Sequence, residues 1–148
     1  MPVRPSPPRF GWLLLPLLLA GCGTVKSPTE PPPEGPGTGT AFTFAQIQRE
    51  IFTPTCAKAG CHDAASASEG LVLEAGVSYG LLVGHPSSEH GSLNRVEPGS
   101  PERSYLILKL RGDPSITGQR MPLDGPPYLT PEQIEGIAAW IRAGAPND

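Results

Sequence analysis

Three cysteines constrain this chain of 148 residues more than any other feature. In an exported protein, an odd number of cysteines leaves at least one thiol outside any internal disulfide. Cys22 directly follows an apolar run, whereas Cys56 and Cys61 lie close together and Cys61 is followed by His62. The first cysteine and the later pair therefore need separate explanations.

The N-terminal segment has the residue order of a bacterial export signal. Arg4 and Arg9 precede the apolar run 12–19, which is too short to cross a bilayer. Small residues follow this run, as they do before a peptidase cleavage site. We therefore predict that residues 1–21 are a signal peptide.

The end of this segment, Leu19-Ala20-Gly21-Cys22, resembles the lipobox of bacterial lipoproteins. The resemblance implies that Cys22 becomes the acylated first residue and anchors the protein in the bacterial cell envelope, with its domain in the periplasm or at the cell surface. Gly23 stands where an aspartate would favour the inner membrane, so the outer membrane is favoured. The alternative is an ordinary signal peptide with an incidental cysteine.

The segment from Gly23 to Thr40 consists almost entirely of Gly, Pro, Thr, Ser and Glu. Such a segment cannot bury enough apolar area to fold. We predict that residues 22–40 are an extended tether and that residues 41–148 form one folded domain. The formal net charge of −3 gives no sign of a nucleic-acid binder.

The folded region carries two matching helix-start signals. The segment Phe42–Ile47 has Thr and Gln at capping-box spacing, with apolar residues on either side placed as a hydrophobic staple. The segment Leu129–Ile134 repeats this pattern and adds Pro at the first helical position. We therefore predict a first helix that ends at Pro54 and a last helix that stops at Gly144.

A middle helix is predicted from Ser100 to Leu110, with Arg111-Gly112-Asp113 as its stop. The segment Gly70–Leu73 is a candidate for a short strand. The aromatic residues Tyr105 and Trp140 are expected in the core. The remainder is long Gly-, Pro- and Ser-rich loops, so the fold is predicted to be a few helices joined by loops.

The cysteine pair and the adjacent histidine resemble a cofactor-attachment signature. In c-type cytochromes, CxxCH supplies two thiols that add to the haem vinyl groups and a histidine that ligates the iron. Here four residues separate Cys56 from Cys61 instead of two, and His62 follows directly. Side chains five positions apart on a continuous helix point about 140° away from each other, so the segment must bulge. Gly60 provides the backbone freedom for that bulge.

Two other interpretations of this motif stay open. Cys56 and Cys61 are able to form a small disulfide, which would close a short loop and stabilise little. The same two thiols are also zinc ligands in principle, together with His62 and another histidine, although no second cysteine pair is present.

A second axial ligand for a haem iron is available in Met121. It is the only methionine that remains after removal of the signal peptide, and it lies in a polar loop with Pro122 directly after it. A methionine on an apolar helix face is usually a core residue, so this loop position favours a ligand. His85 and His90 are the alternative distal ligands.

The stretch from Ile47 to Asp148 resembles the cytochrome c-like domains with a widened CxxxxCH site found in planctomycetes and myxobacteria, many of which are lipoproteins. The matching segments, besides Cys56–His62, are Arg95–Pro101, Ser104–Leu106, Lys109–Leu110, Arg120–Pro122 and Trp140–Ala145. The resemblance implies an all-α, class I cytochrome c-like fold around one covalent haem c. It also implies that His62 and Met121 bind the iron from opposite faces.

These expectations define a function and its alternatives. A haem with both axial positions filled leaves no site for a substrate, so we expect an electron carrier between periplasmic or surface redox proteins, not an enzyme. Arg95 and Arg120 are candidates to pair with the haem propionates. The alternatives are a lipid-anchored binding or structural module with a Cys56–Cys61 disulfide, and an accessory subunit or haem sensor in which Met121 dissociates.

Overall fold

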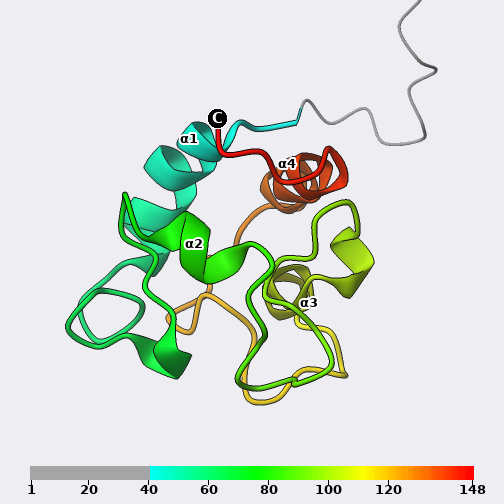
Figure 1. The fold of residues 1–148 in the computed structure, drawn as a ribbon. Helices are drawn as coiled ribbons and strands as arrows, with labels where there is room; N and C mark the ends of the chain where they lie inside the picture. Colours follow the sequence, from blue (N-terminus) through cyan, green and yellow to red (C-terminus); the bar gives the residue numbers. More distant parts are fainter. Residues whose placement is uncertain (1–40) are drawn as a thin grey trace, which may run out of the picture. The chain divides into compact units, whose positions relative to one another are not determined.

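The computed structural model describes residues 41–148, which belong to one compact unit built mainly of helices and loops (Figure 1). The predicted signal peptide, Cys22 and the predicted tether lie outside the described residues. The helices are α1 (Phe44–Ile47), which continues as a wide π-helix (Gln48–Cys56), α2 (Ser78–Leu82), α3 (Tyr105–Arg111) and α4 (Pro131–Arg142), with short 3₁₀ turns at Ser68–Gly70 and Pro101–Arg103.

Strand pairing in residues 41–148 is limited to isolated β-bridges between pairs of residues. These pairs are Val83 with Val96, Pro86 with Asn94, and Asn94 with Ser104. None of the helices in this part of the chain is long and apolar enough to cross a bilayer. The described fold is therefore helical, with loops that take up the remaining length.

Both predicted capping boxes are present. The Thr43 hydroxyl accepts from the Gln46 backbone N–H at 3.1 Å, and the Thr43 N–H donates to the Gln46 side chain at 2.9 Å. Thr130 and Gln133 repeat this exchange at the start of α4, at 3.2 and 2.9 Å. Each box satisfies backbone N–H groups that the helix itself leaves without partners.

The predicted end of the first helix at Pro54 is wrong, because the helix runs through this residue to Cys56. Proline lacks the N–H of a regular α-turn, and its ring clashes with the carbonyl four residues earlier. The helix widens here, and the Ala57 N–H donates to the Phe52 carbonyl five residues earlier at 2.8 Å. The wider turn tolerates the proline and makes Cys56 the last helical residue.

The predicted middle helix is split in two. A 3₁₀ turn at Pro101–Arg103 is followed by Ser104 in an extended conformation, and α3 begins only at Tyr105. The Ser104 hydroxyl accepts from the Glu97 N–H at 2.9 Å, a local bond that competes with helix formation. The stop at Gly112 is confirmed, since its φ of 69° is left-handed.

The predicted strand at Gly70–Leu73 is absent. Gly70 ends a 3₁₀ turn, and the extended residues after it bond to the neighbouring loop: the Leu73 N–H donates to the His62 carbonyl at 2.7 Å. Helix α2, which no sequence pattern indicated, lies between this segment and the loops that follow.

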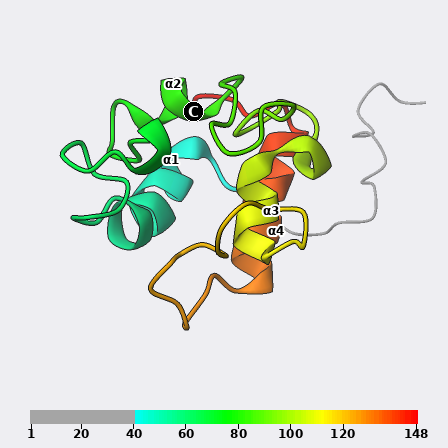
Figure 2. The ribbon, with the colours of Figure 1, turned by 90° about the horizontal axis from the view of Figure 1, so that it is seen from below.

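The core gathers around α4, whose Trp140 is 1 % exposed. The ring of Phe44 on α1 lies 5.5 Å from the Trp140 ring, and α3 packs beside α4 (Figure 2). Tyr105 is also buried, which confirms both aromatic core predictions. The other buried apolar side chains of the core include Ile47, Ile51, Phe52, Leu73, Leu82, Val96, Ile107, Leu110, Ile134, Ile137 and Ile141.

Candidate functional site

A cavity of about 380 Å³ lies between the end of the π-helix, the loop after Gly60, α3 and the segment 119–124. This volume falls within the range of pockets that bind small molecules and cofactors. Its walls include all four of the side chains that the sequence singled out as haem-binding, namely Cys56, Cys61, His62 and Met121.

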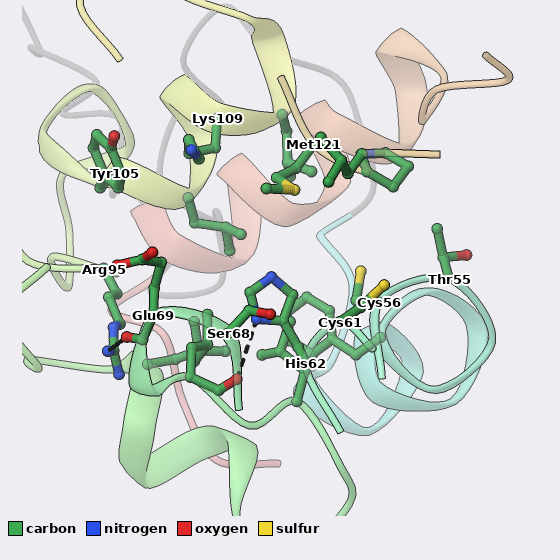
Figure 3. A pocket seen from close by; sticks show the side chains of 18 of the residues that line it. Thr55, Cys56, Cys61, His62, Ser68, Glu69, Arg95, Tyr105, Lys109 and Met121 are labelled. Atoms are coloured by element: carbon green, nitrogen blue, oxygen red, sulfur yellow. Dashed lines mark hydrogen bonds between the residues drawn. The ribbon is translucent and has the colours of Figure 1, made fainter. Parts of the chain in front are cut away.

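The two cysteines reach the cavity from one side. Cys56 ends the π-helix, and the chain then turns back through Gly60, whose φ of +82° is left-handed. The Cys61 N–H donates to the Lys58 carbonyl at 2.9 Å and the His62 N–H to the Cys56 carbonyl at 3.2 Å, which closes the turn. Both sulfur atoms lie close together, as free thiols (Figure 3). The predicted bulge is confirmed.

The His62 imidazole has a defined orientation in the cavity wall. Its Nδ1 lies 3.1 Å from the Leu71 carbonyl oxygen. Because a carbonyl only accepts, Nδ1 is the donor in this contact, and Nε2 is the ring nitrogen that is available to a ligand in the neutral imidazole. The ring projects into the cavity (Figure 3). A histidine held in this way is prepared to ligate a metal through Nε2.

Met121 lies across the cavity from the His62 ring (Figure 3). Its backbone N–H donates to the Lys109 carbonyl at 3.0 Å, so the end of α3 fixes this point of the loop. Its side chain packs against the core. A thioether in this place is a soft ligand opposite an imidazole.

The alternative distal ligands do not line the cavity. His85 is exposed, and its Nδ1 lies 3.1 Å from the Pro86 carbonyl. His90 is half-buried, with its ring 5.7 Å from that of Tyr105. Within residues 41–148 no three Cys, His, Asp or Glu side chains gather as a metal site.

Burial raises the pKa of the Cys56 thiol to about 12, although the nearby Lys58 ammonium opposes the shift. The thiol is therefore protonated at neutral pH. Lys58 itself forms an exposed ion pair with Asp124 at 2.8 Å, which joins the cysteine loop to the segment after Met121.

The part of the cavity away from the cysteines is polar. Arg95 lies there, buried, and its guanidinium donates to the Leu81 and Glu69 carbonyls, each at 2.8 Å (Figure 3). Arg120 is elsewhere: its guanidinium stacks 4.1 Å from the Tyr128 ring centroid and does not line the cavity. Of the two arginines considered for a cofactor carboxylate, only Arg95 is at the site.

Sequence reasoning did not identify Leu71 or Lys109 as parts of this site. Leu71 contributes a backbone carbonyl, which leaves no signature in a side-chain pattern. Lys109 was visible only as part of a matching segment, yet it is 7 % exposed, which is rare for a lysine.

Comparisons with protein-family models, with curated proteins and with solved structures gave no significant match for this chain. The chemistry of the cavity is therefore the basis for a functional assignment.

Proposed function

We propose that residues 41–148 form a single-haem c-type cytochrome domain with a cytochrome c-like fold, and that the protein is an electron carrier. The observation that carries this proposal is the convergence of two thiols, one imidazole and one thioether on a single cavity. Each of these groups has a known place in covalent, low-spin haem binding.

The residues present fit the haem group. Cys56 and Cys61 open on one side of the cavity, which suits two neighbouring vinyl groups. His62 and Met121 face each other across it, so their imidazole and thioether are the groups that would hold the iron. The walls between them are apolar, with Phe52, Leu73, Leu82, Leu106 and Leu110 among the lining residues.

The distribution of polar groups supports the same assignment. The propionates of haem lie away from its vinyl groups, so they would project away from the cysteines. Arg95 and Tyr105 line that part of the cavity together with Glu69 and Glu89, and the guanidinium and the phenol are the groups there that can donate to carboxylates.

When bound, haem supplies a one-electron couple between ferric and ferrous iron. His62 and Met121 would hold the iron, and the methionine thioether would favour the ferrous state. Such a domain has no open iron position for a substrate. The partners we propose are therefore redox proteins of the periplasm or cell surface, and we propose that a lipid on Cys22 holds the protein at a membrane.

The test is expression of the full chain together with the c-type haem maturation system. We expect sharp reduced absorption bands, one haem per chain by mass, and colour that stays with the protein after acid-acetone extraction. Replacing Cys56 and Cys61 together by Ser should abolish the retained colour. A colourless wild-type protein with these sulfurs joined as a disulfide would overturn the proposal and support a structural module.

The distal ligand is tested by Met121→Ala, with His85→Ala as the matched control. Loss of the thioether should convert the spectrum towards high spin and lower the midpoint potential while haem stays attached. The control should leave both quantities unchanged, because His85 does not line the cavity. Ready binding of carbon monoxide by the reduced wild-type protein would instead indicate a sensor or accessory subunit.

A further inference from the structure

The segment 117–121, which carries Met121, is hydrogen-bonded to α3 at Thr117. The Thr117 N–H donates to the Tyr105 hydroxyl at 3.0 Å, and its carbonyl accepts from the Lys109 ammonium at 2.9 Å. Tyr105 and Lys109 are four residues apart on α3 and so share one face. The Lys109 Nζ lies 5.7 Å from the centroid of the Tyr105 ring. The side chains of Tyr105 and Lys109 thus bind both backbone polar groups of Thr117.

The other end of this segment, at Arg120 and Met121, is also hydrogen-bonded to α3. The Met121 N–H donates to the Lys109 carbonyl at 3.0 Å, and the Arg120 Nε donates to the Leu110 carbonyl at 2.8 Å. Lys109 therefore contacts the segment twice, by its side chain at Thr117 and by its backbone at Met121. The loop between these contacts has little freedom to move away from the cavity.

The Lys109 ammonium is held by a buried ion pair. Its Nζ lies 2.9 and 3.1 Å from the two carboxylate oxygens of Glu89, and the side chains of these residues are only 9 % and 18 % exposed. Gly118 turns past this pair at a φ of +72°, and a Cβ there would lie 3.5 Å from the Glu89 carboxylate. By contrast, the Arg142–Glu135 pair is 51 % and 34 % exposed.

We infer that Lys109, held by Glu89 and assisted by Tyr105, is a positioning residue that keeps the Met121 sulfur at the distal face of the cavity. This inference rests on the proposed haem function. A buried ammonium with three acceptors is strongly fixed, whereas removal of its charge frees the Thr117 carbonyl and the Glu89 carboxylate together. The loop would then release Met121 for part of the time, and the iron would open to external ligands.

The test uses the haem-loaded full chain and compares Lys109→Met, Glu89→Gln and Tyr105→Phe with Arg142→Met. The readouts are the weak red-region band of a thioether bound to ferric iron, the rate of carbon monoxide binding to reduced protein, and the midpoint potential. We expect Lys109→Met to lose much of the band and to bind carbon monoxide roughly tenfold faster or more. Glu89→Gln and Tyr105→Phe should change in the same direction by less, and Arg142→Met should match wild type.

The direction in which the midpoint potential changes distinguishes a positioning role from a simple charge effect. Loss of Met121 ligation lowers the potential in both Lys109→Met and Glu89→Gln, whereas a through-space charge effect would lower it in the first and raise it in the second. Opposite shifts with an unchanged red-region band would overturn the positioning role. Should Lys109→Met not accumulate, Glu89→Gln carries the test, and wild-type ligation in that variant would overturn the positioning role. A wild-type protein without covalent haem would overturn the proposed function itself.

Discussion

The surroundings of Cys56 set its chemistry in the haem-free domain. Cys56 is half-buried at the end of the π-helix, and the loss of hydration around its thiol raises its pKa to about 12. The thiolate is the reactive form of cysteine, so the raised pKa lowers the reactivity of this sulfur towards alkylating reagents at neutral pH.

The same shift predicts how the stability of the haem-free domain depends on pH. The ordinary pKa of a thiol is 9.0 and the folded value is about 12, so the folded state holds this proton where the unfolded state has lost it. The contribution of Cys56 is therefore complete below pH 9 and declines as the pH rises towards 12, by about 1.4 kcal/mol per pH unit. Urea unfolding at a series of pH values measures this slope.

Other groups also titrate at high pH, so the comparison is with Cys56→Ala. The variant should show a shallower decline of the free energy of unfolding above pH 9, because it has no buried thiol to ionise. Equal slopes for the two proteins would mean that the Cys56 thiol is accessible to water in the folded domain.

The sequence alone identifies the candidate ligands but not the groups that hold them in place. Cys56, Cys61, His62 and Met121 are chemically distinctive residue types, and the structure brings them to one cavity. The groups that hold them in place are backbone carbonyls and the buried ion pair of Lys109, which depend on tertiary contacts between distant segments. Such contacts do not produce a recognisable pattern in the local sequence.

At the scale of elements, the most predictable features are those with local causes. The starts of α1 and α4 follow from a Thr and a Gln three residues apart, and the end of α3 follows from Gly112. Helix α2 was missed because five residues give too little periodicity. The helix through Pro54 was missed because the expected break was replaced by a wider turn.

The close approach of α4 to the segment before α1 leads to a mutational prediction. Gly136 lies inside α4, and a Cβ there would come within 2.4–2.9 Å of atoms of the Phe42 ring. Alanine usually stabilises a helix relative to glycine, by up to about 1 kcal/mol. Here the clash should outweigh that gain, so Gly136→Ala should lower the free energy of unfolding by about 1–3 kcal/mol. Denaturant unfolding of the purified protein measures it.

Gly80→Ala in α2 is the matched control, because a Cβ at Gly80 meets no other atom within 4 Å. This variant should be as stable as wild type or more so. If Gly136→Ala were equally benign, the Phe42 ring would have to move aside at little cost, and the contact between these segments would not be a tight one.

At the scale of the whole molecule, the cavity lies within the only large core of the described residues. Core residues such as Phe52, Leu73, Leu82 and Leu110 also line the cavity. A group bound there would complete the packing between the π-helix and α3, so binding and folding should be coupled. The overall fold was predictable only as helices joined by loops, because the arrangement of these helices depends on what their loops enclose.

The remaining prediction concerns where the molecule is held. If Cys22 is the lipidated residue, then Cys22→Ser, secreted behind an ordinary cleavable signal peptide, should move the protein from the membrane fraction to the soluble fraction. The haem spectrum should not change, because the candidate ligands all lie in the folded domain. Ser27→Ala, five residues later, is the matched control and should remain with the membrane. Retention of Cys22→Ser after a high-salt and alkaline wash would mean that another attachment holds the protein, and an unmodified Cys22 in the mass of the mature wild-type protein would contradict lipidation itself.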